Sequence, residues 1–375
     1  MLTWLFAEVS PRPLGLARAI VGAAALIRSV VAWQVLFRLA EPGVMHAPYA
    51  DWIPDPSVPL ALVLIVAWVV SSTLFMVGWN VPVTGTLLFS SIVMTLALDQ
   101  QTYGNHVYLM AWLVLLLTLA GAGSGVNIGR IDRPVVRWPV LLVMAQLSVV
   151  YGFSALTKLN ASFLSGRVLA GTLGTGVLPF PEGLKTPVIL SIMATVAVIV
   201  ELFIAVFIWR PRFRPAAFVL GLGLHTAITL WMFGTLQLLV FSLLMLSIYP
   251  LFLPAERLLV AWDDDCGSCR DWIRRFGRLD VLHLLDPVGK NDPRNSVPAG
   301  LVERSMYLTT DAGTHSGFRA VTGILERVVP TLWFAPVFRL PGVRGLGERW
   351  YRWQARRRSC LVGAVPGTRR GSTAR

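Results

Sequence analysis

Long apolar stretches alternate with short polar segments over the first 253 residues of the chain. A helix needs about 20 mostly apolar residues to cross the hydrocarbon core of a bilayer, and the Pro, Gly and charged residues in between interrupt helices and prefer water. The last two stretches are separated only by a short turn near Gly234. The pattern predicts about eight transmembrane helices, over residues 14–37, 58–77, 82–98, 106–122, 138–158, 186–209, 215–233 and 236–253.

The first stretch, 14–37, is predicted to stay in the protein as its first span. It is longer than the apolar core of a signal peptide, it contains Arg18 and Arg28, and no small-residue cleavage site follows it. Arg18 and Arg28 are close to a whole number of helical turns apart, so they share one helix face. That face should look into the bundle or toward phosphate headgroups.

Beyond residue 253 the pattern changes to that of a small α/β domain. Residues 258–262 read as a short buried strand, and a Cys-x-x-Cys motif leads into an amphipathic helix over 270–279. A second strand at 305–309 and a helix near 318–328 follow. We therefore expect an all-α polytopic membrane bundle over residues 1–253, joined to a thioredoxin-like α/β domain over 254–375.

Composition supports this division into a membrane part and a water-soluble part. Of the 375 residues, 55% are hydrophobic and 14% are charged, about half the charged fraction of a typical soluble domain, and the mean hydropathy is +0.64. Residues 1–250 hold 13 of the 33 Lys and Arg and 8 of the 20 Asp and Glu. The net charge of +13 fits the excess of Lys and Arg on cytoplasmic segments of membrane proteins, so no nucleic acid partner is expected.

The charges between the stretches also predict an orientation. With eight spans both termini lie on one side, and the loops alternate between the two sides. Placing the basic loops and the basic tail together satisfies the positive-inside rule and puts both termini in the cytoplasm. We expect a multi-pass plasma-membrane protein with Arg130, Arg133, Arg137, Arg210, Arg212 and Arg214 inside, and Glu41, Asp51, Asp55, Asp99 and Glu182 outside.

Three polar residues at helix ends are candidates for acid–base chemistry. Asn105 and His106 open the fourth predicted span and Lys158 closes the fifth, so antiparallel packing would place them at one depth, near the outer face. Desolvation disfavours the charged form of a lysine, and a neutral lysine beside a neutral histidine can act as a general base. We therefore predict Lys158 as the base, supported by His106 and Asn105.

The same residues also allow a purely structural interpretation. A lysine at a helix end can extend its ammonium to the headgroups, and His106 can be an ordinary interfacial residue. Glu201 and His225 lie deeper, in the sixth and seventh spans, where an ionisable side chain needs a partner. We expect Glu201 and His225 to satisfy each other as a buried pair, with a role in chemistry as the alternative.

The sequence around these residues resembles that of a known family. Residues 150–160 read VYGFSALTKLN and are continued by FLSG at 163–166, and residues 105–109 read NHVYL. Together with the segment that begins at His225, they look like the HTTM membrane domain shared with vitamin K-dependent gamma-carboxylase. The similarity covers about residues 10–253.

The resemblance implies roles for the candidates. In that family, the lysine matching Lys158 is the base that deprotonates vitamin K hydroquinone, and the pair matching Asn105 and His106 assists it. Oxygen then converts the hydroquinone to its epoxide, and the strong base formed removes a proton from a glutamate γ-carbon, which adds carbon dioxide. Our candidates for substrate binding are Tyr108, Tyr151, His225 and Glu201.

This chain departs from the peptide-modifying carboxylases in one respect. Those enzymes carry a sizeable extra-membrane domain, whereas the only sizeable outer loops predicted here are 38–57 and 159–185. We therefore expect oxidation of a quinol or another lipid-soluble acid. No tightly bound cofactor is expected; a quinol of the vitamin K type is the expected co-substrate, and membrane lipid and a protein redox partner are the expected partners.

The soluble part carries a second candidate site, Cys266 and Cys269. A strand, a Cys-x-x-Cys motif and a helix in this order place the first cysteine at a helix N-terminus, which stabilises its thiolate. The three aspartates at 263–265 oppose thiolate formation. Inert structural cysteines and a zinc site are the alternatives; His283 and Cys360 lie far along the chain, so the sequence offers no second ligand pair at zinc spacing, and no metal is expected.

The tail around these cysteines resembles the DCC (DUF393) family of thiol-disulfide oxidoreductase-like proteins. The pattern of that family begins Tyr-Asp-Gly-x-Cys-x-x-Cys and ends in a Tyr- and Arg-rich helix like 350–357. Trp262 stands here in place of the Tyr, and Asp264 in place of the Gly. The basic run 356–358 is expected to touch anionic lipid on the cytoplasmic face.

Three interpretations of function stay open at this point. In the first, the protein is a membrane enzyme in which Lys158 deprotonates or oxidises a lipid-soluble quinol. In the second, Cys266 and Cys269 are the active pair of a membrane-anchored thiol-disulfide oxidoreductase. In the third, the helices form a transporter or a noncatalytic interaction protein.

Overall fold

A computed structural model describes residues 2–129, 132–232, 234–254, 257–310 and 313–356. The chain divides into two units, Met1–Pro254 and Ala255–Arg375, and each has its own hydrophobic clusters. The first unit is helical, and the second is built around a β-sheet. Four residues that carried sequence-based predictions lie outside the described residues, namely Arg130, Arg357, Arg358 and Cys360.

Eight helices among the described residues coincide with the eight predicted apolar stretches. They are α2 (Arg12–Leu39), α3 (Val58–Val77), α4 (Val81–Leu98), α5 (Asn105–Leu119), α6 (Arg137–Lys158), α9 (Pro187–Phe207), α10 (Arg214–Trp231) and α11 (Thr235–Ile248). Within the described ranges, five of them are long and apolar enough to cross a membrane, namely α2, α3, α4, α6 and α9. The all-α membrane bundle is confirmed, whereas the number of eight spans stays a prediction.

Short elements connect the long helices. The N-terminal segment contains α1 (Leu2–Leu5) and β1 (Glu8–Val9), which pairs antiparallel with β2 (Val135–Val136) before α6. The connection from α6 to α9 contains α7 (Ala161–Leu164), α8 (Arg167–Thr172) and the 3-10 turn η3 (Glu182–Leu184). Further 3-10 turns are η1 (Gln100–Thr102), η2 (Ala122–Ser124) and η4 (Tyr249–Phe252).

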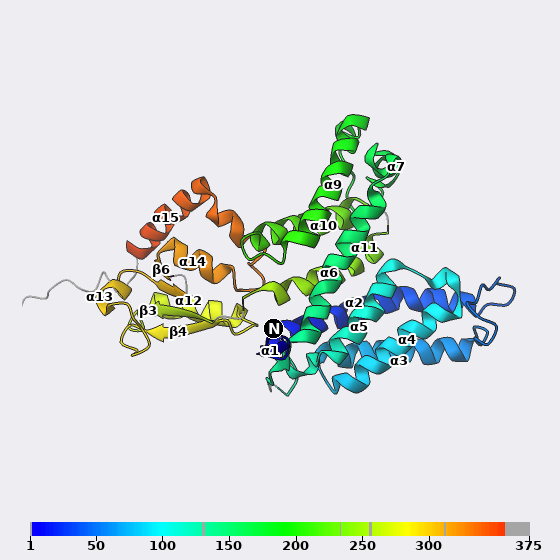
Figure 1. Cartoon of the computed structure of the whole chain (residues 1–375), viewed down its shortest axis with the longest axis horizontal. Helices are drawn as coiled ribbons and strands as arrows, with labels where there is room; N and C mark the ends of the chain where they lie inside the picture. The colour runs from blue at the N-terminus through cyan, green and yellow to red at the C-terminus, as the bar shows by residue number, and fades with distance from the viewer. Residues whose placement is uncertain (1, 130–131, 233, 255–256, 311–312, 357–375) are drawn as a thin grey trace, which may run out of the picture. The chain divides into compact units, whose positions relative to one another are not determined.

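The first helix of the bundle, α2, lies at its centre. It packs against α3, α5 and α11, and α4 contacts both α3 and α5 (Figure 1). Small residues allow the close approach: a Cβ on Gly22 would lie only 2.7 Å from the Cα of Met76 on α3. On the other side of the unit, α6 packs against α9 and α10 packs against α11.

Arg18 on α2 is fully buried and holds three segments together. Its guanidinium donates to the carbonyl oxygens of Phe75 and Met76, at 2.8 Å for Met76. It also donates to those of Ala122 and Val126, at 3.2 and 2.5 Å. The carbonyls in the last turn of α3 have no partner within the helix and carry partial negative charge, so Arg18 acts as a clamp inside the bundle and not as a headgroup ligand.

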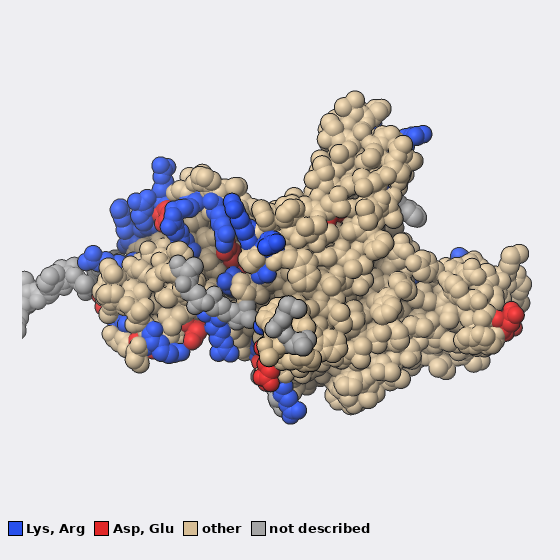
Figure 2. Space-filling model, viewed as in Figure 1, with Lys and Arg blue, Asp and Glu red and all other residues tan. Residues whose placement is uncertain are grey.

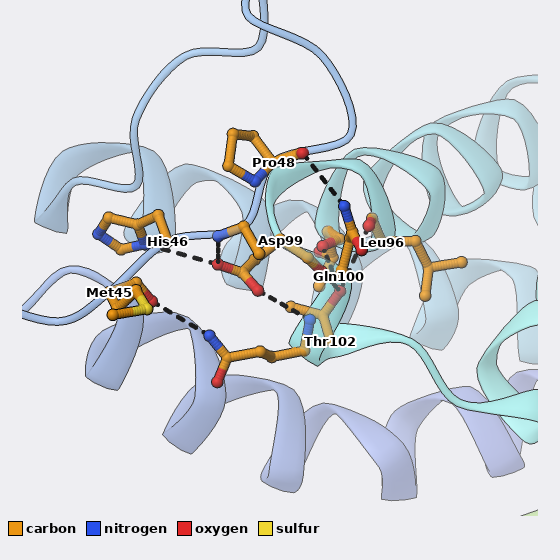
Figure 3. Close-up of polar contacts among 10 residues, drawn as sticks. Met45, His46, Pro48, Leu96, Asp99, Gln100 and Thr102 are labelled. Atoms are coloured by element: carbon orange, nitrogen blue, oxygen red, sulfur yellow. Dashed lines mark hydrogen bonds and ion pairs between the residues drawn. The ribbon is translucent and has the colours of Figure 1, made fainter.

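Asp99, at the end of α4, is fully buried and anchors the loop between α2 and α3. Its Oδ2 accepts from the backbone N–H of Ala47 at 3.0 Å and lies 3.6 Å from Nδ1 of His46 (Figure 3). Its Oδ1 accepts from the backbone N–H of Gln101 at 2.7 Å, and the Gln101 side chain donates to the carbonyl of Met45 at 3.1 Å. These bonds fix the segment that leads into α5 and so set the position of its first turn.

The second unit is an α/β domain with a four-stranded sheet in the order β4-β3-β5-β6. Its elements are β3 (Leu258–Trp262), α12 (Gly267–Leu279), β4 (Leu285–Gly289), α13 (Ala299–Val302), β5 (Tyr307–Thr310), β6 (Gly313–Ser316), α14 (Phe318–Leu325), the 3-10 turn η5 (Ala335–Arg339) and α15 (Pro341–Arg356). β3 and β4 are parallel, and β5 pairs antiparallel with β3 and β6. This β-α-β unit followed by β-β-α confirms the predicted α/β class.

The core of the second unit follows from its alternating pattern. Leu258 and Val260 point from β3 to the same side as Leu308 of β5, where they meet Phe276 of α12 and Ile324 of α14. The helix predicted to start at residue 270 begins earlier, at Gly267. Lys and Arg gather on the visible face of this unit, whereas the visible face of the long helices is almost free of charge (Figure 2).

Replacing Arg18 by Met should lower the midpoint of thermal unfolding of the purified protein by several degrees. The change leaves buried carbonyls without a donor, and each such group costs about 1–3 kcal/mol. Arg38→Met is the control, because Arg38 is exposed on the same helix. Equal shifts in the two variants, measured by thermal unfolding in detergent, would contradict the clamp.

Candidate functional site

A cavity of about 650 Å³ lies between α5, α6 and α11. Its polar lining consists of Asn105 and His106 from α5, Gln146, Ser154 and Thr157 from α6, and Gln237 from α11. The remainder is apolar or aromatic and includes Tyr108, Leu109, Val149, Val150, Phe153, Leu238 and Phe241. The predicted meeting of the first turn of α5 with the last turns of α6 is thus found, at a cavity of the size and character of a small-molecule site.

Lys158 is anchored behind one wall of this cavity. Its Nζ donates to Oγ of Ser154 at 2.6 Å and to Oε1 of Glu201 on α9 at 2.5 Å. Ser154 in turn donates to the same carboxylate oxygen at 3.1 Å. Glu201 is buried and its Oε2 has no hydrogen-bond partner. The ammonium is therefore turned to a carboxylate inside the unit and does not extend to the headgroups, which corrects the structural interpretation of Lys158.

His106 has a different partner from the predicted one. Nε of Arg28 on α2 donates to its Nε2 at 3.2 Å, and no hydrogen bond joins His106 to Lys158 in the described part of the chain. The direct Lys158–His106 contact was therefore wrong. The reason is that α6 directs Lys158 to α9, whereas α5 directs His106 to α2. His106 lines the cavity, whereas Lys158 is connected to it only through Ser154.

Tyr151 and His225 belong to a second buried polar cluster. The Tyr151 hydroxyl is hydrogen-bonded to Nε2 of His225 at 2.8 Å and to the hydroxyl of Tyr249 at 2.9 Å, and Nδ1 of His225 is bonded to Ser242 at 3.1 Å. Both nitrogens of His225 are thus satisfied without Glu201, so the predicted Glu201–His225 pair was wrong. Gly221 makes room for this cluster, because a Cβ there would lie 2.0 Å from the Tyr249 hydroxyl.

The candidates for substrate binding fall into two groups. Tyr108 lines the cavity, whereas Tyr151, His225 and Glu201 are buried outside its lining. His225 does reach the cavity wall indirectly, because its ring lies 5.6 Å from that of Phe241. The substrate-binding role of all four stays a prediction.

Sequence reasoning missed several residues of this site. Ser154 lies four residues before Lys158 and so on the same helix face, a signal that was available in the sequence. Arg28 was predicted to lie on a face looking into the bundle or toward phosphate headgroups, but nothing in the sequence assigned it to His106. The glutamines 146 and 237 are polar residues within apolar stretches and could have been singled out on the same ground as His225.

In the second unit, Cys266 and Cys269 lie at the start of α12. Cys266 is the N-cap residue of this helix, and the two cysteines are 0% and 4% exposed. Cys266 is disulfide-bonded in this structure, and Cys269 is not its partner. Cys269 lines an apolar cavity of about 110 Å³ together with Trp272, Phe276, Met306 and Trp350. The predicted strand, Cys-x-x-Cys, helix order is therefore present.

Lys290 changes the electrostatic environment predicted for the cysteines. Its Nζ lies 3.3 Å from Asp263 and 2.8 Å from Asp265, and Glu303 is a third partner at 3.0 Å. Its backbone N–H donates to the carboxylate of Asp264 at 3.1 Å. The hydrogen bond from Lys290 holds the pKa of Asp265 below its usual 3.8, and its carboxylate partners raise the pKa of Lys290. The aspartates before Cys266 are thus paired, which offsets the opposition to a thiolate.

Lys290 was not singled out from the sequence, although its position is readable there. β3 and β4 are parallel, so their carboxyl ends lie at the same edge of the sheet, where Asp263 follows one strand and Lys290 the other. No group of three or more His, Cys, Asp or Glu side chains able to hold a metal occurs among the residues that the structure describes.

Replacing Lys290 by Met should lower the protection of β3 and β4 from amide hydrogen exchange, and the loss should depend on pH. A carboxylate whose pKa is lowered by folding stabilises the fold at pH values above its pKa in the unfolded state, about 3.8. This contribution disappears as the pH falls through the pKa of the folded state. The pKa of Lys290 is raised, so its contribution to stability persists at pH values up to and above its usual pKa of 10.5. The variant should therefore differ from the wild type at pH 7 and approach it below pH 3.8.

Hydrogen exchange measured by mass spectrometry on peptides from 258–290 checks this expectation. Arg274→Met is the matched control, because Arg274 is an exposed cation on α12 whose partner Asp271 lies 3.8 Å away. A difference between wild type and Lys290→Met that is the same at pH 7 and at pH 3 would show that the carboxylates do not depend on Lys290.

Two family models match the chain. The one described as HTTM domain matches residues 6–256, and the one described as DCC1-like thiol-disulfide oxidoreductase matches residues 260–364. No curated protein and no solved structure matches the chain. Both resemblances drawn from the sequence are confirmed, one for the helical part and one for the α/β part.

Proposed function

We propose that this chain, which belongs to the HTTM domain family and carries a DCC1-like thiol-disulfide oxidoreductase domain, deprotonates and oxidises a lipid-soluble quinol within its helical unit. We place the protein in the plasma membrane with both termini in the cytoplasm, because the basic loops then obey the positive-inside rule. The vitamin K type of quinol is our candidate substrate, by resemblance to the family of gamma-carboxylases.

A single contact supports the proposal most. Ser154 lines the cavity, and its hydroxyl is 2.6 Å from Nζ of Lys158, which is itself 2.5 Å from Glu201. A quinol hydroxyl bonded to Ser154 in this cavity is therefore one side chain away from an amine and a carboxylate. The apolar and aromatic walls suit a ring that is dissolved in lipid.

The proton balance of the first step follows from this chain of groups. Lys158 passes a proton to Glu201, and the neutral amine then takes the proton of Ser154 while Ser154 takes that of the quinol. The result is a charged Lys158, a neutral Glu201 and a quinol monoanion. Glu201 is thus the net proton acceptor, and Lys158 is the base that acts on the substrate side.

The electron acceptor that we propose is dioxygen. The monoanion transfers two electrons and its remaining proton to dioxygen, and the proton on Glu201 completes hydrogen peroxide. The products are quinone and hydrogen peroxide, and the Lys158–Glu201 ion pair is restored. We do not propose carboxylation of a peptide, because the connections 40–57 and 159–186 contain only short helices and turns among the described elements.

Replacing Lys158 by Ala should lower quinol-dependent oxygen uptake about a hundredfold or more, the size of effect that general bases have. The assay uses the purified full-length protein in nanodiscs with menadiol as quinol and records oxygen uptake and peroxide. Lys185→Ala is the control, because Lys185 also pairs with a glutamate, Glu182 at 2.7 Å, but does not line the cavity. Unchanged uptake in Lys158→Ala, or equal losses in both variants, would overturn the proposal.

A second function, thiol–disulfide exchange by the α/β unit, is favoured by one observation. Cys266 caps the N-terminus of α12, and Lys290 pairs with the aspartates that precede it. Backbone N–H groups at a helix N-terminus stabilise a thiolate. Once its disulfide is reduced, Cys266 would be the attacking thiol and Cys269 the resolving one. The pair would give two electrons to a protein disulfide and would itself become a Cys266–Cys269 disulfide.

Replacing Cys266 by Ser should abolish reduction of a disulfide substrate, such as insulin in the presence of dithiothreitol, because the attacking thiolate is removed. Cys269→Ser should instead trap a mixed disulfide between Cys266 and the substrate, visible by mass spectrometry. Both variants should leave menadiol oxidation unchanged. Insulin reduction that is the same in wild type and Cys266→Ser would exclude this second function.

A further inference from the structure

Arg28 is a buried cation for which the described part of the protein supplies no counter-ion. The residue is 8% exposed, its Nη1 is buried without a hydrogen-bond partner, and its Nε donates to the neutral acceptor Nε2 of His106 at 3.2 Å. No Asp or Glu among the described residues forms an ion pair with it. Two other cations of the helical unit differ, because the buried Arg18 holds carbonyl oxygens and the half-buried Lys158 holds Glu201.

An uncompensated charge at this place destabilises the protein. Removing a guanidinium from water without a partner costs several kcal/mol after relaxation, and ionisable groups between apolar helices usually mark a site of function. Arg28 stays charged under all ordinary conditions, so it cannot reduce this cost by losing its proton. A ligand that carries a negative charge would compensate it.

The hydrogen bond from Arg28 also determines which way His106 can act. An arginine has donors only, so Nε2 of His106 must use its lone pair, and the neutral ring carries its proton on Nδ1. No described residue accepts from Nδ1. The ring edge with Nδ1 lies against Gly104, where a Cβ would come within 3.2 Å of it. His106 is part of the cavity lining, and because its Nε2 lone pair is taken by Arg28, the ring can offer a ligand a hydrogen-bond donor but not a base.

We infer that the cavity between α5, α6 and α11 binds an anion, with an oxygen of the ligand accepting from Nδ1 of His106 and with its charge balanced by Arg28 behind the ring. The class of ligand is the conjugate base of an acidic, lipid-soluble ring compound. The identification of this ligand as a quinol monoanion rests on the proposed function. The preference for an anion depends on Arg28 and His106 alone.

This assignment divides the cavity into two functional ends. Ser154 leads to Lys158 and Glu201 and removes a proton, whereas His106 and Arg28 stabilise the negative charge that this removal creates. Such a fixed donor is worth most where water is excluded. The anion is thus favoured over the neutral quinol by a pair of residues that take no part in the proton transfer.

The wild-type protein alone tests the inference. The probes are 2-hydroxy-1,4-naphthoquinone, which is an anion at neutral pH, and 2-methoxy-1,4-naphthoquinone, a neutral compound of the same shape. The anion should bind about tenfold to a hundredfold more tightly, the difference between hydrogen bonds to charged and to neutral acceptors. Binding is measured by quenching of tryptophan fluorescence in nanodiscs of uncharged lipid. Equal affinities in the wild type would overturn the inference.

Variants then assign the preference to its residues. Arg28→Gln should bring the affinity ratio of the two probes close to one, and Arg28→Lys should retain part of it, because the charge is kept. Arg38→Gln, an exposed arginine of the same helix, should leave the ratio unchanged. A ratio that stays high in Arg28→Gln would assign the preference to another group and so refute the role of Arg28.

The outcomes separate this inference from the proposed function. If Lys158→Ala loses menadiol oxidation while the wild type binds both probes equally, the quinol oxidation stands and the anion site is refuted. If the anion preference depends on Arg28 while Lys158→Ala oxidises menadiol normally, the anion site stands and the proposed function is refuted.

Discussion

The cost of burying charge between apolar helices governs the arrangement of the helical unit. A single charged side chain in a bilayer costs several kcal/mol unless it is paired or reaches water. Arg18 is therefore surrounded by backbone carbonyl oxygens, and Lys158 by a carboxylate and a hydroxyl. Each pairing joins at least two helices. The polar residues therefore fix the relative rotation of these helices, whereas their apolar faces alone would allow several rotations.

This constraint also explains why polar chemistry gathers at one end of α5 and α6. Asp99 fixes the segment that enters α5, and the end of α6 carries Ser154 and Lys158 on one face. Between them lies a cavity with an apolar wall and a polar end. The contacts that stabilise the bundle and the groups suited to proton transfer are thus partly the same, and a substrate entering from lipid would meet them without passing through water.

The α/β unit solves a related problem in a more polar setting. Three aspartates precede Cys266, and a parallel strand brings Lys290 to the same edge of the sheet, where it contacts two of them directly and a third through its backbone. The close approach depends on Gly289, since a Cβ there would lie 2.6 Å from the Asp264 carboxylate. A lysine far along the chain therefore offsets a local charge pattern that by itself opposes a reactive thiol.

The sequence by itself determined the long helices, the two-part organisation, the strand and helix around Cys266 and both family resemblances, because these depend on local hydrophobic periodicity and on motifs of adjacent residues. Only the tertiary structure decided the partners of the polar side chains: Lys158 with Glu201, His106 with Arg28, and His225 with Tyr151. Those partners depend on how each helix is rotated and crossed against its neighbours. A hydrophobic stretch specifies that a helix avoids water but not which polar side chain it faces. Several pairings therefore fitted the same sequence, and packing selected one of them.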